Sequence, residues 1–212
     1  MNFKRARTDA QIEERRKEIL LACAELFDHG DVDDVHFKAI GEKTSFARSS
    51  IYKYYTTKEE ILLDLLLSDI LHWMDDIEAI SKLDGSLSKE AFCRAYADTY
   101  INNERLLRLM SILHSGLEKN CSLEKLVTFK NEIAAYTSVV YTCVSKVFPK
   151  ASSDNVTKFI TMTSSYVMGL YPMVHLSEKQ KKAIELSSYE NHVTDFAQSC
   201  YDGFYVMASL LD

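Results

Sequence analysis

Apolar residues recur at helical spacing along most of the chain, and the first such segment lies near the N-terminus. Ile19, Cys23 and Phe27 follow one another every four positions, so they share one face of a predicted helix. The run TDAQ, which begins at Thr8, has the residue types of a capping box and marks the start of this helix. Gly30 follows the last apolar position and is suited to end it.

Two short helices are predicted next, over residues 37–44 and 47–54, with a tight turn at Ser45 and Phe46 between them. The second helix has two unlike faces. Its apolar positions are Ala47, Ile51 and Tyr55, and its polar positions are Arg48, Ser49, Tyr52 and Lys53. Two short helices joined by a few residues, the second with a basic and hydroxyl-rich outer face, have the layout of a helix-turn-helix.

A long helix is predicted to follow. The run TKEE, which begins at Thr57, is a second capping box, and a polar stop comes near Asp84 and Gly85. The apolar stripe between them consists of Leu62, Leu66, Ile70, Trp73, Ile77 and Ile80. Such a helix is longer than a three-helix unit needs, so we expect it to join two domains, residues 1–56 and residues 57–212.

The rest of the chain shows helical patterns and no strand pattern. Helices are predicted over residues 88–102, 104–117, 122–148, 153–176 and 190–211. The breaks are Asn102 with Asn103, the run KNCS, Pro149, and the polar run SEKQKK, and Pro172 with Gly169 predicts a kink in the fourth of these helices. The expected fold is all-α, with an N-terminal three-helix helix-turn-helix domain joined by a long helix to a C-terminal helical bundle.

Composition agrees with this fold class and excludes several others. Only 2 Pro and 6 Gly occur in 212 residues, too few for the many turns of a β-sandwich or barrel. The 5 Cys are an odd number without a CxxC pair, which excludes a disulfide framework and a zinc ribbon. Cys121 is the one thiol expected to be exposed, and nothing near it in the sequence would lower its pKa. No cofactor is expected.

Charge is unevenly distributed. The chain carries a net charge of −6, but residues 38–58 hold five basic residues and one acidic residue, whereas residues 59–212 hold 14 basic and 21 acidic residues. A short basic segment on an acidic protein can bind phosphate groups locally. No apolar run reaches the roughly 18 residues of a membrane span, and no apolar run follows the basic start, so we expect a cytoplasmic protein without membrane contact.

The run IGEKTSFARSSIYKYYTTKEEIL, residues 40–62, resembles the DNA-binding signature of the tetracycline-repressor (TetR/AcrR) family of bacterial transcription regulators. The resemblance extends over residues 12–66. It is carried by Phe27, Gly30, the helix-turn-helix, Tyr52 with Tyr55, and Lys58 with Glu59 and Ile61. Four positions depart from the family pattern: Gly41 for Ala, Ser45 for Gly, Phe46 for Val, and Ala47 for Ser or Thr. From residue 83 onward the resemblance is in architecture only.

The resemblance implies a double-stranded DNA partner, read by a helix in the major groove. The candidate DNA-binding residues are Lys38, Arg48, Ser49, Ser50, Tyr52, Lys53, Tyr54 and Lys58, with Lys4, Arg5 and Arg7 as further basic residues before the first helix. Arg48 is suited to a bidentate contact with guanine, and Lys58 adds its charge to a helix N-terminus. The plain alternative is that the lysines form a solvated face and the tyrosines belong to the core. We favour core for Tyr55 and a DNA contact for Tyr52.

The resemblance also implies a pocket for a small organic effector in the C-terminal domain. The region from residue 73 to 171 is rich in aromatic and Met residues, which are suited to line an apolar cavity but equally suited to a core. The candidate ligand-binding residues are Trp73, Met74, Tyr100, Met110, His114, Tyr136 and Tyr166. His114 and Glu118 have a spacing that could hold a metal ion, but without a third ligand an ordinary His–Glu contact is favoured, and the same holds for His72 and Asp76.

A homodimer is predicted through the last two helices, about residues 153–176 and 190–211. The second of them carries an apolar stripe of Val193, Phe196, Ala197, Cys200, Phe204, Met207, Ala208 and Leu211, and Gly203 would permit close helix approach. Two reading helices about 34–36 Å apart would match a palindromic site. A ligand bound near Trp73 and Met74 would tilt the long helix and release the DNA.

The sequence therefore predicts a ligand-responsive transcriptional regulator, a repressor more than an activator. One alternative is a helical small-molecule binding protein of the same fold that does not regulate. Another is an all-helical enzyme, but the sequence has no HExxH, GxSxG, phosphate-loop or dinucleotide motif, so catalysis has no positive support.

Overall fold

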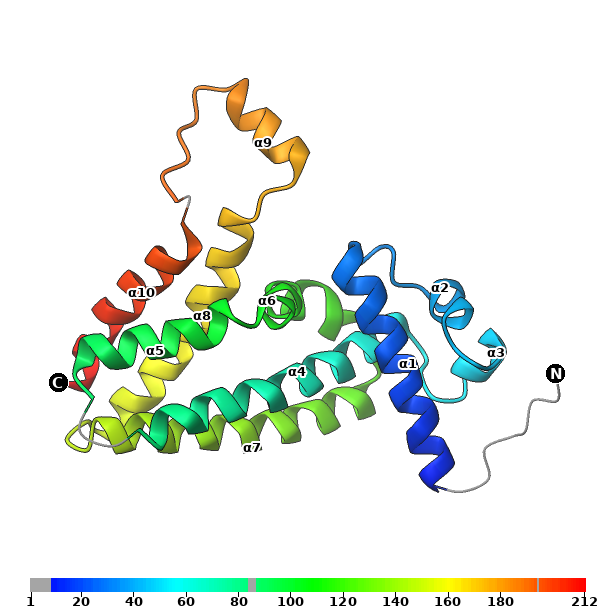
Figure 1. The fold of residues 1–212 in the computed structure, drawn as a ribbon, viewed down its shortest axis with the longest axis horizontal. Helices are drawn as coiled ribbons and strands as arrows, with labels where there is room; N and C mark the ends of the chain where they lie inside the picture. The colour runs from blue at the N-terminus through cyan, green and yellow to red at the C-terminus, as the bar shows by residue number, and fades with distance from the viewer. Residues whose placement is uncertain (1–8, 84–86, 194) are drawn as a thin grey trace. The chain divides into compact units, whose positions relative to one another are not determined.

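The computed structural model describes residues 9–83, 87–193 and 195–212, and these residues form helices and no strand (Figure 1). The helices are α1 (Asp9–His29), α2 (Phe37–Glu42), α3 (Arg48–Ile51), α4 (Lys58–Ser81), α5 (Lys89–Ile101), α6 (Glu104–Ser111), α7 (Leu123–Val147), α8 (Ser153–Val174), α9 (Glu178–Glu185) and α10 (Phe196–Met207). Three short turns complete them: η1 (Leu113–Leu117), η2 (Glu118–Asn120) and η3 (Ala208–Leu211). The all-α prediction is confirmed.

The chain divides into two compact units, which are described separately. Unit 1 contains the described residues up to Ser68 together with Ile112–Glu132, and unit 2 contains Asp69–Ser111 and Ile133–Asp212. Unit 1 thus takes in η1, η2 and the start of α7 as well as the first three helices. The functional boundary expected at residue 57 stays a prediction, because compactness groups the residues in a different way.

The core of unit 1 is formed by the apolar faces that the sequence pattern identified. Ile19, Cys23 and Phe27 of α1 are almost fully buried, and so are Ile40 of α2 and Ile51 of α3. Since α2 and α3 have only 6 and 4 residues, too few for stable isolated helices, packing on α1 and α4 must hold them in place.

The core of unit 2 is a cluster of aromatic rings contributed by α5, α8 and α10. Tyr96 of α5 lies 5.8 Å from Phe159 of α8 and 5.1 Å from Phe204 of α10, measured between ring centroids. Phe92 and Tyr100, one turn to either side of Tyr96, extend the cluster. Aromatic pairs of this kind contribute about 0.5–1.5 kcal/mol each beyond their burial, so this cluster ties the three helices together.

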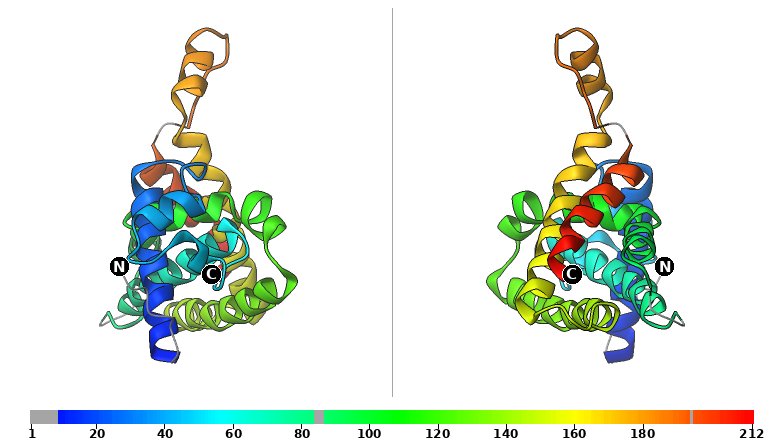
Figure 2. Two further views of the ribbon diagram at one scale, coloured as in Figure 1. Left: turned by 90° about the vertical axis from the view of Figure 1, so that its right-hand side faces the viewer. Right: turned by 90° about the vertical axis from the view of Figure 1, so that its left-hand side faces the viewer.

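The sequence prediction was wrong at the run SEKQKK, which forms α9 and not a break. Ser177 and Gln180 make a full capping box, in which each side chain bonds the backbone of the other. The helix carries no buried residue and therefore shows no apolar stripe, which is why periodicity missed it. In Figure 1 and Figure 2, α9 stands apart from the other helices of unit 2.

Other helix ends differ from the prediction by short distances. The helix expected over residues 104–117 ends at Ser111 and continues as the π-helical turn η1, and the last helix begins at Phe196 and not at residue 190. α4 ends at Ser81, and α8 continues through Pro172 to Val174. The capping box at Thr8, the stop at Asp84 and Gly85, and the basic residues Lys4, Arg5 and Arg7 lie outside the described residues.

Candidate DNA-reading surface and effector site

The outer face of α3 carries the polar side chains that the sequence singled out. Arg48, Ser49, Tyr52 and Lys53 are exposed, and Ser50 and Tyr54 are half-buried. The guanidinium of Arg48 donates a hydrogen bond to the Tyr52 hydroxyl over 3.0 Å. Tyr52 is 50% exposed, and its ring packs edge-on against Phe37 at 4.5 Å. The predicted pairing of Arg48 with Tyr52 is confirmed, and both side chains remain open to solvent.

The other side of α3 faces the protein. Tyr55 is 4% exposed, which confirms its predicted place in the core, and its hydroxyl donates to the Asp64 carboxylate at 2.8 Å. Burial in the first place, and then the charge of Asp64, raise the pKa of Tyr55 above its usual value. Tyr55 therefore anchors the end of the helix-turn-helix to α4, while Tyr52 stays on the surface.

Gly41 allows α2 and α3 to approach each other closely. A Cβ atom at this position would lie 3.0 Å from the Cβ of Arg48 and 3.2 Å from its Cα. The first residue of α3 thus packs directly over α2. Ala47, which precedes α3, makes no side-chain cap, so the helix begins without the hydroxyl bond that Ser or Thr would supply there.

Two of the candidate lysines differ in their surroundings. Lys38 has 71% of its side chain exposed and lies 4.0 Å from Glu42. Lys58 has only 25% exposed, and its ammonium donates to the backbone oxygen of Val32 at 2.7 Å and lies 3.8 Å from Asp33. The amine that the sequence assigned to phosphate is therefore already bound to the loop before α2. A shallow depression beside it is lined by His36, Phe37, Lys38, Arg48, Thr57, Lys58 and Glu59.

The second capping box is only half formed. The Thr57 hydroxyl accepts a hydrogen bond from the N–H of Glu60 at 3.3 Å, as expected. The Glu60 carboxylate, however, accepts from the Thr56 N–H and not from the Thr57 N–H, and it also accepts from the N–H and hydroxyl of Ser122. Burial raises the pKa of Glu60, but these hydrogen bonds outweigh it, so the pKa lies below its usual value.

The contact with Ser122 fastens the start of α7 to the start of α4 within unit 1. One turn further along, Lys125 pairs with Asp64, which also accepts the hydrogen bond from Tyr55. The segment 112–132 is thus joined through two carboxylates to the residues that support the helix-turn-helix. The sequence pattern could not identify this link, because its polar members lie about 60 positions apart along the chain.

Three of the candidate ligand-binding residues lie together in unit 2, and they are buried. The indole N–H of Trp73 donates to the Thr99 hydroxyl at 2.8 Å, and its ring lies 4.8 Å from Tyr100. Met74, next to Trp73, is 6% exposed. The hydroxyls of Tyr96 and Tyr100 are 3.4 Å apart, inside the aromatic cluster. Burial raises the pKa of Tyr96 to about 12, so both groups are neutral hydrogen-bonding hydroxyls at physiological pH.

The remaining candidates are not gathered at this point. Met110 and Tyr136 are half-buried, and Tyr166 packs on Gly203 and donates to the backbone oxygen of Ser199 at 2.9 Å. His114 belongs to unit 1, where its ring bonds Glu118 at 3.2 Å, which confirms the ordinary contact favoured for this pair. Among the residues described, no group of three His, Cys, Asp or Glu side chains is placed to hold a metal ion.

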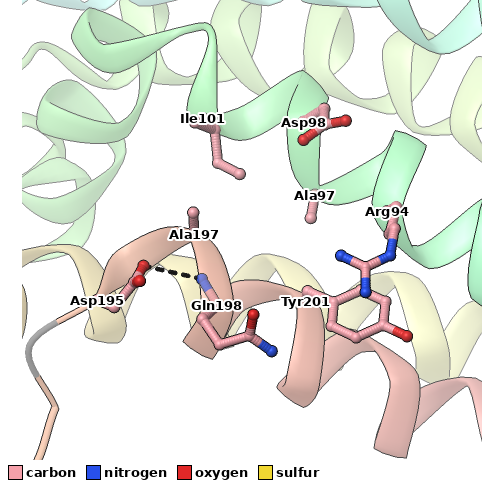
Figure 3. A pocket seen from close by; sticks show the side chains of 8 residues that line it. All are labelled: Arg94, Ala97, Asp98, Ile101, Asp195, Ala197, Gln198 and Tyr201. Carbon is pink, nitrogen blue, oxygen red and sulfur yellow. Dashed lines mark hydrogen bonds between the residues drawn. The ribbon is translucent and has the colours of Figure 1, made fainter.

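A small pocket opens between α5 and α10, in a place that the sequence did not indicate (Figure 3). Its lining residues are Arg94, Ala97, Asp98, Ile101, Asp195, Ala197, Gln198 and Tyr201. The guanidinium of Arg94 lies over the Tyr201 ring at 4.1 Å. The pocket has a volume of about 210 Å³, below the roughly 300–1,000 Å³ that is usual for sites of drug-sized ligands.

Half of the predicted dimer stripe is used inside the protomer. Cys200, Phe204, Ala208 and Leu211 are at most 2% exposed, because this face of α10 and η3 packs on α5 and α8. Gly203 permits a close approach, but the group it admits is the ring of Tyr166 in the same chain. The stripe was misinterpreted because an apolar helical face looks the same whether it meets its own core or a partner.

Cysteine chemistry gives no sign of a redox site. Cys23, Cys93, Cys143 and Cys200 are buried, and Cys121 is partly exposed, as predicted. Partial burial, followed by the charges of Glu60 and Glu59, raises the pKa of Cys121 to about 12. Its thiol donates to the Leu117 backbone oxygen, so it is a poor nucleophile near neutral pH.

Two family models match the chain. Residues 19–65 match the model described as bacterial regulatory proteins, tetR family, and residues 67–209 match the tetracyclin repressor-like C-terminal domain. No curated protein is matched by the sequence. Among the described residues, no helix has the length and apolar character needed to cross a membrane.

Solved structures with the same fold include three bacterial proteins. One, from Mesorhizobium loti MAFF303099 and described as a TetR-family transcriptional regulator, has a TM-score of 0.56 at 14% identity, with 96% of this chain and 98% of that chain covered. SmeT, the repressor of the Stenotrophomonas maltophilia multidrug efflux pump SmeDEF, has 0.53 at 14% identity, with 92% and 88% covered. PfmR, a TetR family regulator from Thermus thermophilus, has 0.53 at 13% identity, with 92% and 98% covered.

Proposed function

Because the chain belongs to the tetR family of bacterial regulatory proteins, which are DNA-binding transcriptional regulators and not enzymes, we propose that it is a homodimeric repressor that a small organic effector releases from DNA. The observation that carries the DNA-reading part is the exposed outer face of α3. Arg48, Ser49 and Lys53 are exposed there, and the Arg48–Tyr52 bond holds the guanidinium forward. A helix presenting such side chains fits the major groove.

In this proposal the candidate residues divide into two roles. Arg48, Ser49, Ser50 and Tyr52 read base edges, whereas Lys38, Lys53, Tyr54 and Lys58 contact phosphates and position the protein. Lys58 also holds the loop through Val32, so its effect on DNA binding includes a structural part.

The dimer forms through the outer faces of α8 and α10. Apolar side chains are exposed on both helices: Met162 and Met173 of α8 are 45% and 50% exposed, and Val206 of α10 is 70% exposed. We expect Met162→Asp and Val206→Asp to convert a dimer to monomers in analytical ultracentrifugation. Leu21→Asp, at an equally exposed apolar residue of α1, should leave the dimer intact. A wild-type chain that sediments as a monomer would exclude this part of the proposal.

The effector binds beside Trp73, Met74 and Tyr100, where an apolar core contains several hydroxyl groups. Thr99, Tyr96 and Tyr100 supply the few polar contacts that orient a ligand in an apolar site. Because these groups are packed against one another without a ligand, binding must open the core, and this movement would shift α4. The links from α4 to segment 112–132, Glu60 to Ser122 and Asp64 to Lys125, then carry the shift into unit 1.

Trp73 is the sole Trp of the chain, so its fluorescence reports on this site directly. A panel of apolar and amphiphilic small molecules should contain compounds that change the emission of the wild type. The same compounds should lower DNA affinity, and Trp73→Phe should reduce that effect. Compounds that alter Trp73 emission and leave DNA binding unchanged would favour a small-molecule binding protein without a regulatory role.

DNA binding is tested by selection of duplexes from a random pool. The expected product is a palindrome bound by two copies, with a steep salt dependence. If about eight phosphates are neutralised per dimer, the logarithm of the binding constant should fall with the logarithm of salt concentration at a slope of about −7. A promoter that carries the selected duplex should lose activity when the protein is present. A flat salt response, or a pool without enrichment, would contradict the proposal.

A further inference from the structure

The turn between α2 and α3 is held by two charged side chains of α1. The N–H of Ser45 donates to one oxygen of the Glu18 carboxylate, and the Ser45 hydroxyl donates to the other oxygen at 3.1 Å. The Arg15 guanidinium donates back to the same hydroxyl, also at 3.1 Å. The backbone N–H and the hydroxyl of this serine are thus both bound to α1.

Arg15 also covers the next residue of the turn. Its guanidinium carbon lies 4.4 Å from the centre of the Phe46 ring, and Phe46 is 4% exposed. Arg15 and Glu18 themselves lie 3.8 Å apart and keep 24% and 30% of their side chains exposed. A cation–π contact and a set of charge-assisted hydrogen bonds therefore meet at two consecutive turn residues.

The reading helix depends on contacts of this kind. α3 has only four residues, and Ala47 before it provides no side-chain cap, so its own backbone bonds cannot fix its direction. Ile51 anchors one side of it in the core. The N-terminal end, where Arg48 begins the exposed face, follows directly on the turn that Arg15 and Glu18 hold.

We infer that Glu18, together with Arg15, is a positioning residue for DNA recognition: it fixes the turn at Ser45 and thereby the direction in which Arg48 points. This inference rests on the proposed DNA-reading role of α3. It predicts an effect opposite in sign to simple electrostatics. Loss of a carboxylate near a DNA-binding surface should strengthen binding to phosphates, whereas loss of this carboxylate should weaken binding to the preferred duplex.

The test compares Glu18→Ala with Glu14→Ala. Glu14 lies four residues earlier on α1 and is exposed, so the two variants remove the same charge from the same helix. We expect Glu18→Ala to bind the selected duplex roughly ten-fold more weakly than Glu14→Ala, while the two variants bind a scrambled duplex equally well. Ser45→Ala, which removes the hydroxyl and keeps the N–H, should show a smaller loss. The double variant Glu18→Ala/Ser45→Ala should lose less than the two single losses combined.

The ratio of affinities for selected and scrambled duplexes separates positioning from instability. A partly unfolded variant binds both duplexes less, so the ratio stays constant, whereas a misdirected α3 lowers the ratio. Amide hydrogen exchange in the free protein gives a second readout that needs no DNA. Residues 45–51 should exchange faster in Glu18→Ala than in Glu14→Ala. If no duplex is selected by the wild type, the proposed function fails while exchange still decides the role of Glu18. Equal ratios and equal exchange in the two variants would overturn the inference.

Discussion

Ser122 makes two interactions at the start of α7, and their loss can be estimated from the structure. Its hydroxyl accepts a hydrogen bond from the Lys125 N–H at 3.3 Å and donates one to the Glu60 carboxylate at 2.7 Å. Loss of a helix cap costs about 1 kcal/mol. Loss of a hydrogen bond to a charged group costs about 1.5 kcal/mol at the low end of the usual range, which suits an exposed serine. Ser122→Ala should therefore lower the free energy of unfolding by about 2.5 kcal/mol.

A matched control isolates the contribution of Glu60. Ser152 caps α8 through the Asn155 N–H at 3.2 Å, with geometry close to that of Ser122, and no carboxylate of the described residues accepts from its hydroxyl. Ser152→Ala should cost only the cap, about 1 kcal/mol. In urea unfolding followed by circular dichroism, the difference between the two variants should be about 1.5 kcal/mol near neutral pH. Equal losses for both variants would refute the assignment.

The pH dependence provides an independent check. The pKa of Glu60 is lower in the folded chain than its ordinary value of 4.5, so the folded state favours the carboxylate. Its stabilisation is complete above the unfolded pKa and disappears as the pH falls through the folded pKa. The excess cost of Ser122→Ala over Ser152→Ala should shrink over that range. Replacing Glu60 by Gln should remove the excess at every pH.

Three further predictions concern packing, thiols and lysines. Gly203→Ala places a Cβ 2.4 Å from the Tyr166 ring and should cost about 1–3 kcal/mol in thermal unfolding, whereas Gly169→Ala, with no atom within 4 Å of the new Cβ, should not destabilise the chain. A colorimetric thiol reagent near pH 7.5 should label native Cys121 much more slowly than the unfolded chain, because its pKa is about 12; labelling at the rate of a free thiol would contradict this. Lys58→Ala should weaken both selected and scrambled duplexes and also lower stability, since its amine bonds Val32, whereas exposed Lys53→Ala should weaken DNA binding alone, as filter binding and urea unfolding can distinguish.

Helical periodicity predicted the fold well because most helices bury one face. The stripe of α4 and the faces of α1 and α3 are where the pattern of apolar residues places them. The same reasoning failed at α9, which buries no residue, and at α10, whose apolar face meets its own core and not a partner. Periodicity identifies which face is apolar, but it does not say what covers that face.

The DNA-reading surface could be predicted further than its supports. The exposure of Arg48 and Lys53 and the burial of Tyr55 follow from spacing within one short helix. The contacts that hold this helix, Glu18 with Ser45 and Glu60 with Ser122, join residues 27 and 62 positions apart. Lys58 illustrates the same limit, because its partner Val32 lies 26 positions earlier and presents only a backbone oxygen. Such pairings depend on tertiary packing, which leaves no local signal in the sequence.

The central claim is that Arg48 reads a base and does not merely attract phosphate. Duplex selection with Arg48→Lys and Arg48→Ala tests it most directly, because Lys keeps the charge but lacks the planar fork needed for a bidentate contact. Both variants should bind the wild-type duplex about 1–3 kcal/mol more weakly and lose preference at the same base pair of each half-site. If Arg48→Lys or Arg48→Ala selects the same sequence as the wild type with the same preference, α3 does not read DNA through Arg48.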